Sequence, residues 1–192
     1  MAINVVRVGT EQKVNQTIDN QQTDASITAL TGGGWVVTWT SLGQDGSGHG
    51  IFQRKYNADG STAGADIQVG TTSAGDQTLP SVTALPNGGW VVTWTSNGQD
   101  GEGLGVYQRR FSASGDAVPE VKVNLTTTGD QSKSVVAGLA GGGWIVAWEA
   151  PDASGSGIFY RKYDNAGSTS GPDIAVNATT GSTQINVSVT AL

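Results

Sequence analysis

Residues 88–111 read GGWVVTWTSNGQDGEGLGVYQRRF. The stretch holds two tryptophans four residues apart, a loop of Gly, Asp and Gln, and an arginine between two aromatic residues. The same pattern occurs three times, and its first tryptophans, Trp35, Trp90 and Trp144, are spaced 55 and then 54 residues apart. A repeat of this length indicates a fold built from copies of one supersecondary unit.

The copies align almost without gaps around the tryptophans. IFQRKYNADG at 51–60 matches VYQRRFSASG at 106–115 and IFYRKYDNAG at 158–167. The repeat units are therefore residues 12–66, 67–120 and 121–173, followed by a partial unit at 174–192 and preceded by a leader strand at 1–11. We expect residues 1–192 to form a single repeat domain.

Each unit reads as four short strands. In the first unit they are SITAL, WVVTW, IFQRKY and DIQV, and clusters of Gly, Asn, Asp and Ser separate them. No window shows helical periodicity, so the sequence predicts an all-β chain. A repeated four-stranded unit is typical of a propeller blade. A threefold β-prism, a β-trefoil and an elongated β array remain alternatives.

Composition excludes several classes of protein. The chain of 192 residues is long enough for one sizeable core, and its net charge of −6 argues against nucleic acid as a partner. The absence of cysteine excludes disulfides and thiolate metal sites. No apolar run is long enough for a membrane span, and the N-terminal MAINVVRVGT lacks the features of a Sec signal.

Tryptophan and arginine recur in every unit. An exposed Trp could stack on a sugar, but a large apolar ring is more often the core anchor of its unit, which is the role we predict here. Each arginine has aromatic residues two positions away on both sides, which favours ring stacking and donation to backbone carbonyls over an acidic ligand. These structural anchors are Trp35, Trp39, Trp90, Trp94, Trp144, Trp148, Arg54, Arg109 and Arg161.

The loop after each tryptophan strand follows the pattern D-x-x-G-x-G. Its carboxylates are Asp45, Asp100 and Asp152. They could be metal ligands for calcium, which binds six to eight oxygens, or they could form Asx-turns in which glycine takes positive φ. One carboxylate per loop is few for calcium, and neither an EF-hand nor the GGxGxD nonapeptide occurs. Both interpretations remain open, and calcium is the only cofactor that the sequence suggests.

The same loops supply the candidate ligand-binding residues. His49 is the single histidine, and Leu104 and Ser156 replace it in the other units. Neither a partner for His49 nor a nucleophile or phosphate-loop motif is evident, so we predict that the protein is not an enzyme. The candidate binding residues are Gln44, Asp45, His49, Gln99, Asp100, Glu102, Asp152 and Ser154.

The motif GGWVVTWTSNGQDG, followed by G-x-Y-x-R, GDQ and PSVTAL, resembles tandem repeats of very large bacterial secreted and surface proteins of the RTX type. The resemblance covers residues 12–192. It implies an adhesin-like binding or structural module at an extracellular or cell-surface location. Because the RTX nonapeptide is absent, the resemblance does not carry calcium dependence with it.

We therefore predict a non-enzymatic, lectin-like module that binds carbohydrate or another cell-surface ligand. The alternative is a structural spacer or self-assembling subunit without a small ligand. Three complete units are too few for a propeller ring, which typically has four to eight blades. Both ends of the chain should leave exposed strand edges, so we expect a homo-oligomer through edge strands or a fragment of a longer array. The apolar residues 3–8, INVVRV, are the candidate strand for completing a neighbour's edge.

Overall fold

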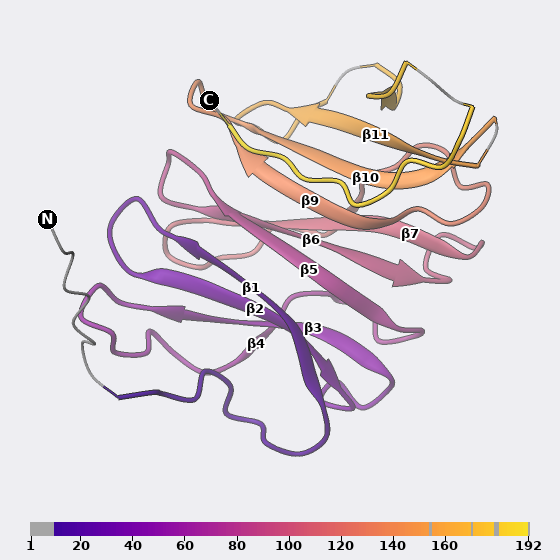
Figure 1. The fold of residues 1–192 in the computed structure, drawn as a ribbon. Helices are drawn as coiled ribbons and strands as arrows, with labels where there is room; N and C mark the ends of the chain where they lie inside the picture. The colour runs from indigo at the N-terminus through magenta and orange to yellow at the C-terminus, as the bar shows by residue number, and fades with distance from the viewer. Residues whose placement is uncertain (1–9, 154, 170, 179–180, 192) are drawn as a thin grey trace, which may run out of the picture.

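The computed structural model describes residues 10–153, 155–169, 171–178 and 181–191. These residues form three four-stranded antiparallel sheets joined by turns and loops, which confirms the predicted all-β class (Figure 1). The predicted leader strand at 1–11 lies almost wholly outside the described residues, and residues 3–8, the candidate edge-completing strand, lie wholly outside them. Within the described part of the chain, no helix could cross a membrane.

Each sheet follows chain order from its first to its fourth strand. Sheet 1 contains β1 (Gln22–Ala29), β2 (Trp35–Leu42), β3 (His49–Tyr56) and β4 (Ile67–Gln68). Sheet 2 contains β5 (Gln77–Ala84), β6 (Trp90–Asn97), β7 (Leu104–Phe111) and β8 (Val121–Lys122). Sheet 3 contains β9 (Ser132–Gly138), β10 (Trp144–Asp152), β11 (Gly155–Tyr163) and β12 (Ile174–Ala175). Sheets and sequence units are therefore out of phase, because each sheet takes its fourth strand from the start of the next sequence unit.

Tight turns connect the first two strands of each sheet. In sheet 1 the Leu30 amide donates to the Gly34 carbonyl over 3.0 Å, and Gly34 has φ of 76°. A Cβ at Gly34 would collide with the backbone oxygen of Tyr56. Both the positive φ and this close approach require glycine, which explains why the GG before each tryptophan recurs.

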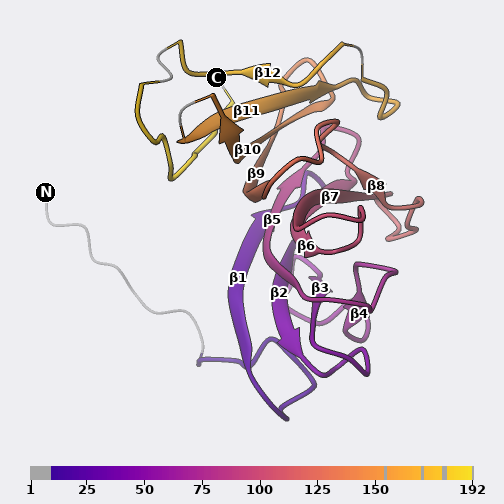
Figure 2. The ribbon, with the colours of Figure 1, turned by 90° about the vertical axis from the view of Figure 1, so that its right-hand side faces the viewer.

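The three sheets stack face to face, with sheet 2 between the other two (Figure 1). The first strands β1, β5 and β9 pack in succession along one edge, which we call the inner edge. Strands β4 and β8 lie on the opposite, outer edge (Figure 2). A threefold prism would also pack sheet 3 against sheet 1, so this linear stack differs from the prism. The sheets do not close into a ring within the described residues.

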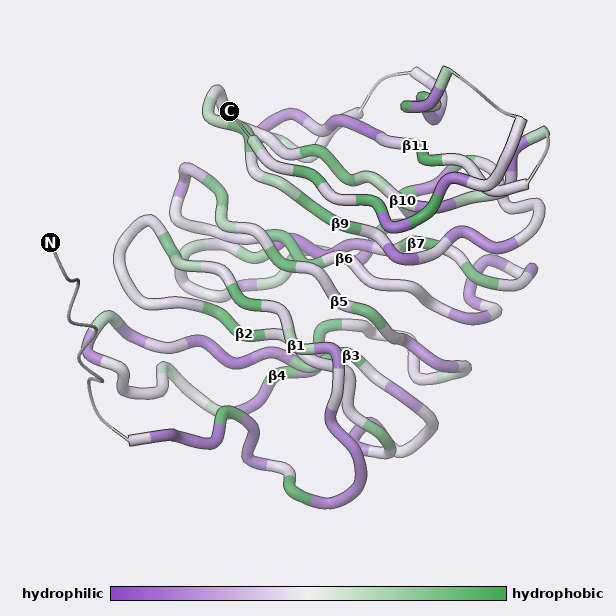
Figure 3. The backbone as a smooth tube through the Cα atoms, in the orientation of Figure 1, coloured by the Kyte–Doolittle hydropathy of each residue, from purple (hydrophilic) through white to green (hydrophobic). Residues whose placement is uncertain are grey.

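Apolar side chains fill the space between sheets. The strands at the centre of each sheet carry most of the hydrophobic positions, and the connecting loops are hydrophilic (Figure 3). Between sheets 1 and 2, the tryptophan-bearing face of sheet 2 packs on the β-branched face of sheet 1, which presents Val36, Ile51 and Val69. The same arrangement recurs between sheets 2 and 3, where Val91, Val106 and Val123 face the tryptophans of sheet 3.

The tryptophans are the largest side chains of these cores. Trp90, Trp94, Trp144 and Trp148 are at most 2% exposed. Trp90 also stacks on Phe111, with 5.3 Å between ring centroids. Only Trp35 of sheet 1 is half-buried. Five of the six tryptophans are therefore buried too deeply to stack on a ligand, which matches the anchoring role predicted for them.

Candidate functional site

The three recurring arginines link each sheet to the segment that precedes it. Each guanidinium donates from Nη1 to a valine carbonyl about 40 residues earlier in the chain. These bonds hold each guanidinium against the backbone of the preceding segment. The donor–acceptor pairs are Arg54–Val14 at 2.7 Å, Arg109–Val69 at 2.9 Å and Arg161–Val123 at 2.8 Å.

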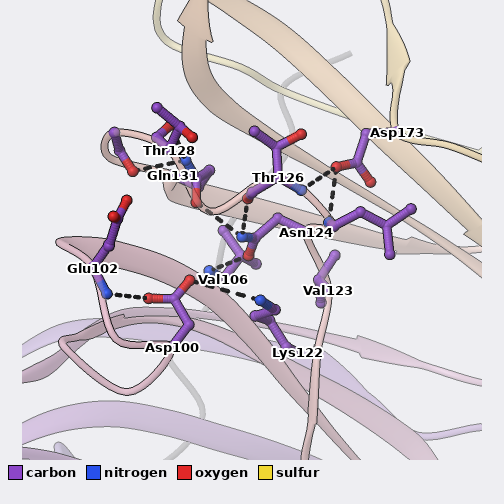
Figure 4. Close-up of polar contacts among 12 residues, drawn as sticks. Asp100, Glu102, Val106, Lys122, Val123, Asn124, Thr126, Thr128, Gln131 and Asp173 are labelled. Atoms are coloured by element: carbon purple, nitrogen blue, oxygen red, sulfur yellow. Dashed lines mark hydrogen bonds and ion pairs between the residues drawn. The ribbon is translucent and has the colours of Figure 1, made fainter.

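A carboxylate that follows each arginine along the chain, at Asp66, Glu120 and Asp173, accepts backbone N–H groups from the same preceding segment. Asp173 accepts from Leu125 N at 2.9 Å and from Thr126 N (Figure 4), and its Oδ1 lies 2.6 Å from Arg161 Nη2. Sequence analysis missed these carboxylates, although the unit alignment places an acid there three times. The other pairs are Asp66 with Gln16 N at 2.8 Å and Glu120 with Thr71 N at 2.6 Å. We call each arginine and its neighbouring carboxylate a latch.

The first two D-x-x-G-x-G loops form Asx-turns. Asp45 Oδ1 accepts from Ser47 N at 3.1 Å, and Asp100 Oδ1 accepts from Glu102 N at 3.3 Å (Figure 4). The second oxygen of Asp45 lies against Gly50, where an added Cβ would be 2.7 Å from it. The last glycine of the motif is therefore needed because the carboxylate occupies the space of a side chain. Gly105 and Gly157 have the same relation to Asp100 and Asp152, at 2.9 and 3.0 Å.

Buried oxygens in these loops bear on the calcium interpretation. Asp45 Oδ2 and Asp100 Oδ2 are buried without a hydrogen-bond partner, and so are the side-chain oxygens of Gln44 and Gln99. Lys122 Nζ lies 3.9 Å from Asp100 Oδ2 and supplies positive charge there. The described residues contain no group of three or more His, Cys, Asp and Glu side chains able to hold a metal. The first two loops thus each offer oxygens from one carboxylate and one amide. Asp152 ends β10, and Ser154 lies outside the described residues.

His49 has a partner that the sequence did not indicate. Its Nδ1 lies 3.0 Å from Oδ1 of Asp76, and its backbone N donates to the same oxygen at 2.9 Å. These two hydrogen bonds, the backbone one first, lower the pKa of Asp76 below its ordinary value of 3.8. In sheet 2 the Leu104 amide donates to Asp130 Oδ1 at 3.0 Å without any imidazole. The backbone contact is therefore the shared feature, and the histidine is an addition in one unit.

The inner edge of the stack carries a backbone conformation that sequence analysis missed. Asp24, Leu79, Lys133 and Asn186 all have positive φ, at 54°, 56°, 52° and 65°. They hold the same position in each unit, and in β1 and β5 they fall at a shift in the pairing register. Positive φ is uncommon outside glycine, and bulges of this kind re-aim side chains and are over-represented near functional sites. Because the four residue types differ, no sequence motif marks the position.

These four residues line one open groove of about 580 Å³, which we call the inner groove. It runs across the first strands of all three sheets and reaches the C-terminal segment. Leu79, Pro80, Val135 and Val187 contribute its apolar surface. Its polar side chains are Asp24, Ser26, Ser81, Lys133, Ser134, Glu149 and Asn186.

Charged groups in the inner groove are engaged to different degrees. Lys133 Nζ lies 3.0 Å from Glu149 Oε2, and the lysine side chain is 50% exposed whereas the glutamate is 8% exposed. The other oxygen of Glu149 accepts from Asn186 N at 2.6 Å. Asp24 is exposed and accepts from Thr23 Oγ1 at 3.0 Å. The groove thus presents an accessible ammonium group and an accessible carboxylate, while Glu149 holds the lysine and the tail in place.

Two smaller pockets lie between sheets. One of about 270 Å³ is lined by Gln108, Arg110 and Trp144, and its counterpart between sheets 1 and 2 measures about 90 Å³. Trp144 Nε1 donates to Gln108 Oε1 at 2.8 Å, and Arg110 covers the ring at 5.7 Å from its centroid. The ring is only 2% exposed. These pockets therefore do not offer an aromatic face to a ligand.

No protein-family model matches this chain, and no curated protein sequence matches it. Solved structures do resemble it. An α-L-arabinanase from Penicillium chrysogenum complexed with arabinobiose is 14% identical over 90% of this chain and 56% of its own, with a TM-score of 0.61. An α-L-arabinofuranosidase from Lactobacillus brevis is 10% identical over 88% of this chain and 61% of its own, with a TM-score of 0.59.

An endo-arabinase from Bacteroides thetaiotaomicron is 17% identical over 77% of this chain and 58% of its own, with a TM-score of 0.51. The chain thus spans less than two thirds of the length of each of these proteins. At such low identity, the similarity shows a common arrangement of antiparallel sheets and nothing of activity.

Proposed function

We propose that this protein is an extracellular, non-enzymatic module that binds a glycan or a related cell-surface ligand in the inner groove. The observation that carries the proposal is the set of four non-glycine residues at positive φ that line this groove. Such strained positions persist only where the surrounding structure holds them, and they cluster at functional sites. Here the positive φ repeats while the side chain changes, as expected for a surface whose repeats contact different parts of one ligand.

The chemistry of the inner groove suits a polyhydroxylated ligand. The half-buried hydroxyls of Ser26 and Ser81, an exposed carboxylate and an exposed ammonium group can exchange hydrogen bonds with sugar hydroxyls. The groove is open along its length, so it accommodates a chain better than a small enclosed molecule. The net charge of −6 disfavours nucleic acid as the ligand.

The groove geometry favours binding over hydrolysis. Glycoside hydrolysis generally needs two carboxyl groups on either side of the scissile bond. Both oxygens of Glu149 are engaged, by Lys133 and by the Asn186 amide. Asp24 is exposed to solvent and accepts a hydrogen bond from Thr23 Oγ1. The groove therefore lacks a free pair.

We also propose that the three sheets are blades of a β-propeller. The solved structures that resemble this chain are β-propeller glycosidases. Face-to-face stacking of four-stranded sheets, with their first strands along a common inner edge, is the arrangement of successive blades. Because these proteins are named as arabinanases and an arabinofuranosidase, arabinose-containing oligosaccharides are the first ligands to test.

A spacer or self-assembling subunit is the second candidate. It is favoured by the latches, in which the same hydrogen bond from an arginine to a valine carbonyl recurs in every unit. Under this alternative the inner groove is a by-product of stacking, and the protein has no small ligand.

A glycan array, followed by calorimetry with the glycans that bind and with arabino-oligosaccharides, separates the two candidates. We expect Lys133→Ala to weaken glycan binding about tenfold, a loss of roughly 1.4 kcal/mol. Lys122→Ala is the matched control, because Lys122 lies outside the inner groove. A blank array with the folded protein contradicts glycan binding. Release of shorter products from a bound glycan contradicts the non-enzymatic assignment.

A further inference from the structure

We propose that a second copy of this chain docks head-to-tail, packing the free face of its sheet 3 on the free face of sheet 1. The free face of sheet 1 is the tryptophan-bearing one, and the free face of sheet 3 is the β-branched one. Those are the two kinds of face that meet at both sheet-to-sheet interfaces inside the chain. The same pairing of faces occurs between sheets 1 and 2 and between sheets 2 and 3. It therefore specifies which surface should pack on each free face.

Exposure identifies the free face of sheet 1. Ile27 is 64% exposed, whereas Val82 and Val136, at the same position of sheets 2 and 3, are 7% and 8% exposed because a preceding sheet covers them. Trp35 is likewise half-buried, whereas Trp90 and Trp144 are buried. A β-branched residue at this level of exposure, beside a partly exposed tryptophan, marks a surface that lacks its partner.

Apolar residues on sheet 3 match the missing half of the interface. The internal interfaces use three β-branched residues, which are Val36, Ile51 and Val69 in sheet 1. Their counterparts on sheet 3 are Ile145, Ile158 and Val176, and no sheet covers them within the described part of the chain. Ile145 and Ile158 are half-buried and Val176 is 59% exposed, whereas all three residues in sheet 1 are fully buried. In the docked pair they would pack on the tryptophan-bearing face of sheet 1, whose buried cluster is Val37, Trp39, Phe52 and Tyr56. Val14 of the N-terminal segment already packs on this cluster, and Arg54 donates to its carbonyl at 2.7 Å. Docking therefore places Val176 where Val14 lies, and the N-terminal segment is displaced.

A polar contact repeats in the same way. Lys55 Nζ lies 5.5 Å from the ring centroid of Trp90 and donates to the Ala113 carbonyl at 2.6 Å. Arg110 makes the same pair of contacts with Trp144 and the Asn165 carbonyl, the latter at 2.8 Å. Aligning the units places Lys162, Trp35 and Ala58 at the equivalent positions.

Lys162 is exposed, and Ala58 lies in an exposed turn beside Trp35. Docking would bring Lys162 of one copy over Trp35 of the second and within reach of the Ala58 carbonyl. The contact would again combine a cation–π interaction with a backbone hydrogen bond.

The C-terminal segment, residues 184–191, competes for this docking surface. Gln184 N donates to Ser156 O at 2.8 Å, as Gln131 N donates to Leu104 O at 2.8 Å in the preceding unit. The segment therefore occupies on sheet 3 the place that β9 occupies on sheet 2. Its Ile185 is 52% exposed. In the docked pair, β1 of the second copy takes the place of this segment.

Head-to-tail contacts use two different surfaces, so they close into a ring or continue as a filament. Two copies supply six sheets, which lies within the usual range of four to eight blades for a closed propeller. We therefore assign the closed pair as the product. The contact is made between sheet faces, whereas the sequence suggested pairing of strand edges.

Sedimentation velocity and light scattering over a dilution series test the proposal. The mass of the wild-type chain is expected to rise from monomer to dimer with concentration. Ile27→Asp and Lys162→Ala should each raise the dissociation constant, by about tenfold or more for Ile27→Asp because it places a carboxylate in the apolar centre of the interface. Val121→Asp is the matched control, because Val121 is 49% exposed on the outer strand of the middle sheet. Circular dichroism verifies that each variant folds.

The competing segment supplies a second, opposite readout. Asn186→Pro removes the N–H that donates to Glu149 and cannot adopt the φ of 65°, so it releases the segment and should strengthen dimerisation. Asn186→Gly keeps the N–H and tolerates positive φ, so it should behave like the wild type. A monomeric mass for both the wild type and Asn186→Pro at every concentration overturns the proposal, as does equal weakening by Ile27→Asp and Val121→Asp. Because Ile27 and Lys162 lie outside the inner groove, glycan binding by these variants is scored separately.

Discussion

At the outer edge of the stack, three units make the same contacts with the same kinds of side chain: an arginine donates to a valine carbonyl, and a carboxylate accepts from the backbone of the preceding segment. At the inner edge, the units share only their backbone. Asp24, Leu79, Lys133 and Asn186 have the same positive φ, but one is acidic, one apolar, one basic and one an amide.

This difference separates what holds the sheets together from what meets a ligand. Where every unit makes the same side-chain contact, only one kind of residue fits the position. Where a position only has to direct a side chain into the groove, the backbone conformation is fixed and the residue type can vary. The outer edge and the tryptophan cores should therefore govern stability, and the inner edge should govern recognition. Substitutions of each kind test the comparison, and the expected effects below decrease in order.

Removing a core tryptophan should have the largest effect on stability. Trp144 is 2% exposed, stacks on Tyr163 and donates to Gln108, so Trp144→Ala leaves a large cavity and an unpaired buried carbonyl. We expect a loss of about 3–5 kcal/mol in the free energy of unfolding. Urea denaturation measures it. Trp35→Ala is the control and should cost clearly less, because Trp35 is half-buried; equal losses would contradict the assignment of sheet 1 as the free face.

Breaking a latch should cost less than breaking the core. Arg109→Ala removes hydrogen bonds to the carbonyls of Val69 and Val118, at 2.9 and 2.8 Å, and we expect a loss of about 1–3 kcal/mol. Glycan binding should persist in the folded variant. Lys133→Ala on the inner edge should weaken binding, and it should lower stability by about 1 kcal/mol because it removes the ion pair to the largely buried Glu149. An Arg109→Ala protein that is fully stable but no longer binds would reverse our separation of the two edges.

Calcium binding would be an exception to the division between repeated contacts that stabilise and variable positions that bind. The D-x-x-G-x-G loops repeat, and yet they contain buried oxygens without a hydrogen-bond partner. If Asp45 Oδ2 and Asp100 Oδ2 are calcium ligands, calcium at ten times its dissociation constant should stabilise the protein by roughly 1.4 kcal/mol through mass action. That corresponds to a rise in Tm of about 3–6 °C for a chain of this size. Thermal melts with millimolar calcium and with chelator measure it. Identical melts would leave the loops as Asx-turns alone.

The smallest effect concerns Asp76. Hydrogen bonds from His49 lower the pKa of Asp76 in the folded chain, so the carboxylate adds stability above its ordinary pKa of 3.8. That contribution is lost as the pH falls through the lowered folded pKa. The difference in Tm between the wild type and Asp76→Asn should therefore be present near neutral pH and shrink below 3.8. A difference that does not change with pH would mean that the ionised carboxylate is not what stabilises this contact.

Much of the fold was predictable because its determinants are side chains that recur. The pattern W-x-x-x-W marks the second strand of every sheet. The glycines of the D-x-x-G-x-G loops occur where a carboxylate or, at Gly155, a threonine hydroxyl leaves little room for Cβ. The phase of the sheets was harder to see, because β4, β8 and β12 contain only two residues each. Alignment alone therefore placed them at the start of the following unit.

The candidate site was far less predictable. Sequence analysis chose loop residues such as Gln44 and His49, because loops between strands commonly carry function. The inner groove depends instead on positive φ at Leu79 and Lys133, and positive φ is not predicted from leucine or lysine in a sequence. This conformation arises from the register shift between paired strands, which is a property of two segments at once. The His49–Asp76 pair was missed for the same reason, since it joins residues of successive units.

The latches also set an order of events in folding. Each one joins residues roughly 40–50 positions apart, so the contact that completes one sheet waits for an acid and an arginine supplied by the next. During synthesis from the N-terminus, the segment at Gln16 can form its hydrogen bond only after Asp66 has been made. The segment at Thr71 can form its own only after Glu120 has been made. Folding should advance as a zipper with a lag of one unit. The most recently made sheet is then always the one open to misassociation with a neighbouring chain.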